Sequence, residues 1–159
     1  MLGTVFMIDS IIGWLSGAEG EGGAAQDELR LALTALLVEA AHGHDHFNER
    51  ERAAIERLIE RRFNLSPSDA SRLLAAGERE ADRSVELFHF ARIINERLSF
   101  QQRVELIEMM WEVAYTDGVR DEYQDSLLRR VGGLIYVPDR ERGMARQRVL
   151  QRLGIDDPL

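Results

Sequence analysis

The sequence predicts an all-α protein, a compact bundle of about seven to eight helices built from two similar three-helix units. Apolar residues recur at helical spacing from about residue 26 to residue 153, and no segment shows the alternation of a strand. Residues typical of helix starts precede most of these apolar runs. One helix–turn–helix segment also matches a second segment 73 residues later, which indicates an internal duplication.

The N-terminal segment, residues 1–16, is predicted to form a loosely amphipathic helix, and residues 17–25 a Gly-rich linker. The segment lacks the positive start of a signal peptide and is too short to cross a bilayer. We expect it to dock on the helical domain, which spans 26–154. Peripheral membrane contact or self-association is the alternative.

Helices of the domain are predicted, in order, over 29–41, 49–63, 67–81, 85–98, 100–114, 122–135 and 139–153. Ser66, Ser84, Ser99 and Asp121 are expected N-caps, and Ser99 forms a capping box with Gln102. Pro138 begins the last helix and Gly154 ends it.

The duplication is visible in two segments that align without a gap, LLVEAAHGHDHFNERERAAIERL and MMWEVAYTDGVRDEYQDSLLRRV. Glu39 matches Glu112 and Ala41 matches Ala114, each 73 residues apart. The apolar positions coincide because each copy buries the same helix faces. We therefore predict two three-helix units joined by the helix at 85–98, related by a pseudo-two-fold axis.

The composition excludes several kinds of chemistry. The 159 residues suffice for one globular domain, of which 45% are apolar and 30% charged. There is no cysteine, and all 20 basic residues are arginine, so thiolate sites, Schiff bases and phosphate-loop lysines are excluded. The net charge of −8 argues against nucleic-acid binding.

Both turns of the duplicated segment carry candidate metal ligands. They are Glu112, Asp117, Asp121 and Glu122 in the second copy, and Glu39, His44, Asp45 and Glu49 in the first. Carboxylates of this kind suit calcium or magnesium, and histidine with carboxylate suits zinc. The second turn also has a structural interpretation, with Asp121 as N-cap and Glu122 near the positive end of the helix dipole. Both interpretations stay open.

The first turn contains the sequence HGHDH at 42–46. His42 and His46 would share a helix face if the helix continued, but Gly43 and the alignment predict that it ends there. We therefore favour a polar turn over a histidine metal site. His89, between Phe88 and Phe90, is expected to lie on a helix face.

The repeated turns, with the stretch LFHFARIINERLSFQQRVELIEMMWEVAYTDG, resemble the TerB family, named for tellurite resistance, over residues 26–137. The family pattern E-x-A-x-x-D-G-x-x-D-E is matched at 112–122, whereas His44, Asp45 and Asn48 depart from it in the first copy. The resemblance implies a TerB-like, non-enzymatic and usually cytoplasmic helical module. It further implies a link to tellurite or stress responses, and metal binding at the acidic turns.

Three functions are compatible with the sequence. The preferred one is a module that binds a divalent metal (Ca, Mg or Zn) and partner proteins. The alternative is a metal-free scaffold that recruits proteins or a membrane surface through its N-terminal helix and the basic segment 129–152, which has seven arginines against two acidic residues. The third is an enzyme using Glu39, Glu112, Asp117, Glu122 or the histidines as acid–base groups. The Glu-x-x-His pairs of dimetal bundles are not present in both halves, which disfavours an enzyme.

Overall fold

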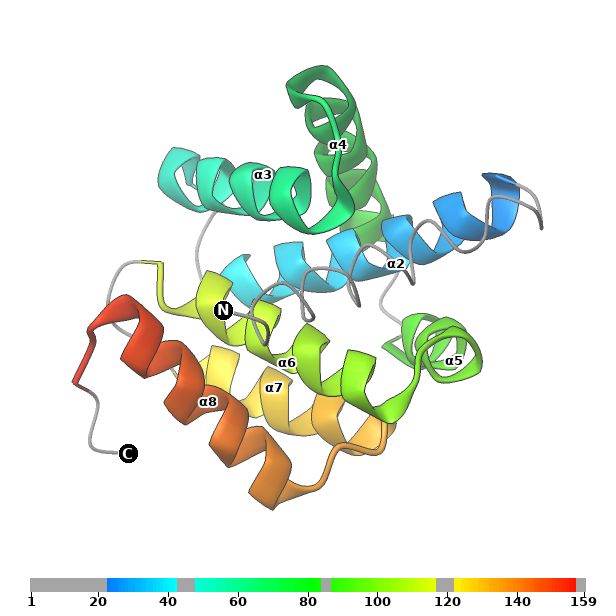
Figure 1. Ribbon diagram of the computed structural model, residues 1–159. Coiled ribbons are helices and arrows are strands. Elements are labelled where there is room, and N and C mark those ends of the chain that lie inside the picture. The colour runs from blue at the N-terminus through cyan, green and yellow to red at the C-terminus, as the bar shows by residue number, and fades with distance from the viewer. Residues whose placement is uncertain (1–22, 43–47, 84–86, 117–121, 157–159) are drawn as a thin grey trace.

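The computed structural model describes residues 23–42, 48–83, 87–116 and 122–156, and these residues form helices and short connections without strands. Figure 1 labels the helices, which are α2 (Gly23–His42), α3 (Glu49–Phe63), α4 (Pro67–Arg83), α5 (Leu87–Arg97), α6 (Phe100–Ala114), α7 (Glu122–Leu134) and α8 (Asp139–Leu153). The predicted all-α class is confirmed. No helix in the described part of the chain is long and apolar enough to cross a membrane.

The helices form two similar units, as the duplication predicts. The first unit contains α2, α3 and α4, the second contains α6, α7 and α8, and α5 lies between them in the chain. In each unit the first helix packs most extensively against the third, α2 on α4 and α6 on α8. Helix α3 begins at Glu49 and α7 at Glu122, which preserves the offset of 73 residues.

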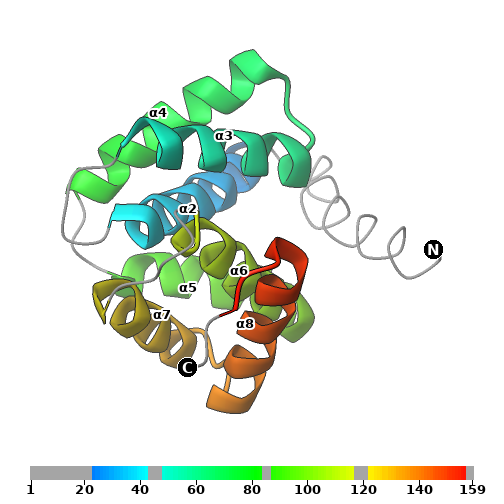
Figure 2. The ribbon, with the colours of Figure 1, turned by 90° about the vertical axis from the view of Figure 1, so that its left-hand side faces the viewer.

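The first helices of the two units, α2 and α6, form the centre of the molecule. They pack against each other, and Figures 1 and 2 show them between α3 and α4 on one side and α7 and α8 on the other. Residues 32–38 and 104–111 are buried without interruption. Such all-round burial is expected of a helix that other helices enclose.

Most predicted helix ends are found in the structure. Ser99 and Gln102 form the expected capping box, and the Ser66 hydroxyl accepts a hydrogen bond from the backbone N–H of Asp69 at 3.1 Å. Gly154 ends α8 with a left-handed φ of 67°. A second capping box, between Asn48 and Glu51 at the start of α3, was not predicted although its residue types are typical.

One predicted boundary is corrected, and two further predictions lie outside the described residues. Helix α2 begins at Gly23, so residues 23–25 are helical rather than part of the linker predicted at 17–25. Two alanines there explain the extension, since alanine is the strongest helix former. The predicted N-terminal helix at 1–16 and the predicted cap at Ser84 lie outside the described residues.

Candidate functional site

The first acidic turn follows α2 and the second precedes α7, and the adjoining ends of these two helices contact each other. The Tyr123 hydroxyl donates a hydrogen bond to a carboxylate oxygen of Glu39 at 3.4 Å. The buried Gln124 side chain donates from Nε2 to the carbonyl oxygen of Ala40 at 3.0 Å. The last turn of α2, which leads into the first acidic turn, therefore packs against the first turn of α7, which follows the second acidic turn.

Four of the predicted ligands can be placed. Glu39 is half-buried beside α7, while Glu49 and Glu122 are exposed at the first positions of α3 and α7. Glu112 is half-buried near the end of α6. His44, Asp45, Asp117 and Asp121 lie outside the described residues, as does His46. Within the described ranges, no three histidine or carboxylate side chains gather as metal ligands would.

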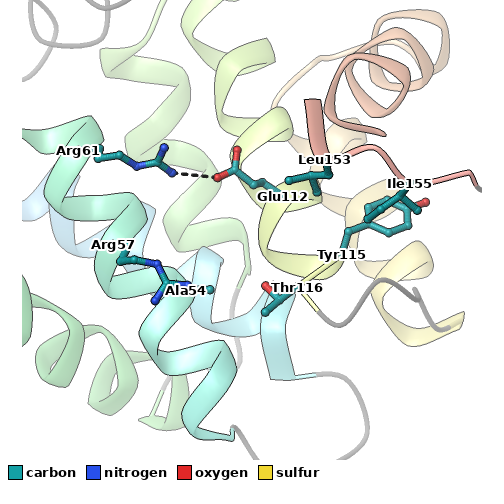
Figure 3. Close-up of a pocket in the computed structure, with 8 residues that line it drawn as sticks. All are labelled: Ala54, Arg57, Arg61, Glu112, Tyr115, Thr116, Leu153 and Ile155. Atoms are coloured by element: carbon teal, nitrogen blue, oxygen red, sulfur yellow. Dashed lines mark hydrogen bonds and ion pairs between the residues drawn. The ribbon is translucent and has the colours of Figure 1, made fainter. Parts of the chain in front are cut away.

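Glu112 takes part in ion pairs between helices. Its carboxylate pairs with Arg61 of α3 at 3.2 Å and with Arg152 of α8 at 3.4 Å, the former contact being drawn in Figure 3. A metal ion bound to Glu112 would compete with both guanidinium groups. The geometry therefore gives this residue of the acidic pattern a structural role, which is to join α6 to α3 and α8.

Glu112 belongs to a row of three glutamates along α6, the others being Glu105 and Glu108. The spacing of three and four residues places them on one helix face. Glu108 is buried, with a side chain 4% exposed, and it pairs with Arg148 at 3.1 Å and Arg152 at 2.8 Å. The row thus links the central helix α6 to the last helix α8.

The basic segment 129–152 contributes several arginines to contacts within the domain. Arg148 and Arg152 pair with the α6 glutamates, and Arg142 pairs with Asp139. Arg146 is buried, donates from Nε to the Tyr115 hydroxyl at 2.9 Å and lies over the Trp111 ring. Four of the seven arginines are therefore used inside the domain. The contacts of Arg146, Arg148 and Arg152 depend on the tertiary position of α8, which the local charge pattern does not reveal.

His89, the one histidine that lies outside the first acidic turn in the sequence, is exposed on α5, as predicted for a helix-face residue. Its ring lies 5.7 Å from that of Phe90, measured between centroids. Helix α2 ends at His42, in agreement with the expected helix end before Gly43.

Glu105 is a buried carboxyl group whose ionisation costs free energy. Its side-chain oxygen Oε2 has no hydrogen-bond partner, and the residue is 3% exposed. Burial raises the pKa of the Glu105 carboxyl, the Arg62 guanidinium lowers it, and the negative charge of Glu108 raises it further. The net effect is a raised pKa, so the folded protein holds the proton more tightly than the unfolded chain does.

We expect Glu105→Gln to make the protein more stable than the wild type at pH 7, with the gain disappearing near pH 4. A raised folded pKa means that the contribution of Glu105 to stability is complete below its unfolded pKa of about 4.3 and is lost as the pH rises through the folded pKa. Melting temperatures of both proteins between pH 4 and pH 8 measure this. Glu96→Gln, at an exposed position of α5, is the control. A difference between wild type and variant that does not change with pH would contradict the expectation.

Fold and site together define a duplicated, all-helical domain in which each copy contains an acidic turn. The family model described as "Tellurite resistance protein TerB" matches residues 30–147, more than half of the chain. The chain therefore belongs to the TerB family. The match reaches into α8, beyond the limit of residue 137 that the turns and the middle stretch suggested. No curated protein and no solved structure shows significant similarity to it.

Proposed function

We propose that this TerB-family domain is a non-enzymatic binding module that takes up a divalent cation where the end of α2 packs against the start of α7. Asp117, Asp121 and Glu122 of the second turn are the principal ligands, and Glu39 supplies a carboxylate from the other half. The cation-bound end then docks a partner protein as part of a tellurite or stress response, a role supported by family membership.

One observation carries this proposal, namely the contact between the end of α2 and the start of α7. Through Tyr123 and Gln124, the helix after the second turn binds the helix before the first, so carboxylates from both repeats belong to one end of the domain. The second turn alone has too few well-spaced ligands for tight binding, because calcium takes six to eight oxygens. A contribution from Glu39 reduces that deficit.

The residue types favour a hard cation. Carboxylate oxygens are the ligands that calcium and magnesium prefer. Glu112 is assigned to the ion pairs with Arg61 and Arg152 rather than to the cation. His44 and Asp45 of the first turn, together with Glu49, offer a second and weaker set, in which an imidazole would favour zinc.

Titration calorimetry of the purified protein with calcium, magnesium and zinc tests the proposal. We expect one oxygen-preferring cation to bind with a dissociation constant on the order of 0.1–1 mM, the range of weak calcium modules. Asp117→Asn and Glu122→Gln should each weaken binding about tenfold, which corresponds to about 1.4 kcal/mol. Glu39→Gln should weaken it less, because this carboxylate also accepts the Tyr123 hydrogen bond.

Glu96→Gln is the matched control, since it removes one exposed carboxylate on α5 from the same protein. Its affinity for the cation should equal that of the wild type. His44→Ala tests the first turn separately. It should lower the affinity for zinc and leave the affinities for calcium and magnesium unchanged. The absence of both binding heat and any rise in melting temperature at millimolar metal would rule out the cation part of the proposal.

A further inference from the structure

A pocket of about 330 Å³ lies between α3 and the C-terminal ends of α6 and α8. Figure 3 shows its two walls. Arg57 and Arg61 come from α3, whereas Leu153 and Ile155 come from the end of α8, with Thr116 from the end of α6 between them. The size falls at the lower end of the range of about 300–1,000 Å³ found for small-molecule sites.

The arginine wall carries positive charge that the described residues neutralise only in part. Arg57 is exposed and forms no ion pair or hydrogen bond with the described residues. Arg61 pairs with Glu112, but its side chain is 67% exposed, and Glu112 is itself shared with Arg152. Arg57 therefore has no carboxylate partner among the described residues, and Arg61 shares its single carboxylate with Arg152. On a protein with a net charge of −8, this is a local site for an anion.

The opposite wall is apolar and partly open to solvent. Leu153 is exposed and Ile155 half-buried, both of them at the end of the last helix. A ligand that covered them would gain hydrophobic free energy in proportion to the apolar area removed from water. Guanidinium groups bind carboxylate and phosphate oxygens in a planar, two-pronged geometry.

We propose that this pocket binds a small amphipathic anion. Its carboxylate or phosphate group contacts Arg57 and Arg61, and a short apolar chain lies against Leu153 and Ile155. The residues that line this pocket include none of the proposed cation ligands. The two proposals are therefore tested by different variants and different ligands.

Trp111 provides a local probe for the experiment. Its ring stacks on that of Tyr115, with centroids 5.8 Å apart, and Tyr115 lines the pocket. The chain has two tryptophans, Trp14 and Trp111, so a Trp14→Phe background confines the emission to Trp111. In this background the protein is titrated with hexanoate, hexyl phosphate, 1-hexanol and inorganic phosphate.

We expect hexanoate or hexyl phosphate to change the Trp111 emission saturably in the millimolar range or below. The tighter of the two identifies the anionic group. Neutral 1-hexanol and inorganic phosphate should bind at least about tenfold more weakly, because each offers one half of the interaction. Arg57→Gln and Arg61→Gln should each weaken binding several-fold. Arg97→Gln, which changes an exposed arginine of α5, should leave it unchanged.

Three results would overturn the proposal. They are no saturable change with either hexyl anion, equal binding of 1-hexanol and hexanoate, and unaltered affinity in Arg57→Gln. Because Arg57 and Arg61 are exposed, their variants are expected to fold. Circular dichroism melting curves of each variant establish this, so that a loss of binding is not confused with a loss of structure.

Discussion

Replacing Gly77 with alanine is expected to lower the free energy of unfolding by about 1–3 kcal/mol. Gly77 lies in α4 where this helix crosses the central helix α2. A Cβ atom at this position would lie 2.6 Å from Cγ2 of Thr34 and 3.1 Å from its Cβ. Thr34 is fully buried and its hydroxyl donates to the carbonyl oxygen of Arg30, so it has little freedom to move away.

Two further variants show whether the close contact is the cause. Thr34→Ser removes the methyl group that the new Cβ would meet, while keeping a hydroxyl for the Arg30 carbonyl, so Gly77→Ala should cost less in that background. Gly143→Ala, in the exposed middle of α8, meets nothing within 4 Å and should raise stability by about 0.5–1 kcal/mol. Urea denaturation compares the wild type, Gly77→Ala, Thr34→Ser, the Thr34→Ser/Gly77→Ala double variant and Gly143→Ala. A Gly77→Ala variant as stable as the wild type would contradict this account of the α2–α4 contact.

Replacing Glu108 with alanine is expected to have a comparable effect, a loss of about 2–3 kcal/mol of stability. Breaking a buried ion pair by removing one partner costs about 3–5 kcal/mol, because the remaining charge lacks compensation. Here Arg148 and Arg152 are 40% exposed and can turn partly to water, which reduces the cost. The pairs themselves join α6 to α8, so their loss also weakens the packing of the last helix.

The same substitution at two other glutamates, Glu112 and Glu96, provides the comparison. Glu112→Ala should cost about 1 kcal/mol or less, because its side chain is 19% exposed and its ion pairs are longer. Glu96→Ala, at an exposed position, should change stability by less than about 0.5 kcal/mol. Guanidinium denaturation would mask ion pairs with salt, so urea is the suitable denaturant. An equal loss at all three positions would contradict the assigned network.

The helices and their duplication were predictable because they depend on local pattern. Apolar spacing locates α3 and α6, and the Ser99–Gln102 capping box locates the start of α6 to the residue. The 73-residue offset predicted the equivalence of α3 and α7, and the two helices begin at the matched residues Glu49 and Glu122. The start of α2 was predicted too late, which shows the limit of local pattern. Glycine favours a linker and alanine favours a helix, so a segment that contains both is compatible with either structure.

Contacts between helices could not be predicted in the same way. Periodicity identifies the apolar face of α8, but not that Arg146 is buried against Tyr115 or that Arg152 reaches Glu108. The contact between Tyr123 and Glu39 joins residues 84 positions apart, so no local pattern reveals it. For the candidate site, the sequence identified the residue types, whereas the structure showed that Glu112 serves ion pairs and Glu39 lies beside α7.

The central claim, a cation held where the two repeats meet, is tested most directly by anomalous diffraction from crystals soaked in manganese, an oxygen-preferring substitute for calcium or magnesium. The proposal predicts an anomalous peak between the end of α2 and the start of α7, about 2.0–2.6 Å from carboxylate oxygens of the second acidic turn and close to Glu39. Crystals that show no peak there, or that show manganese only at scattered surface carboxylates, would contradict it.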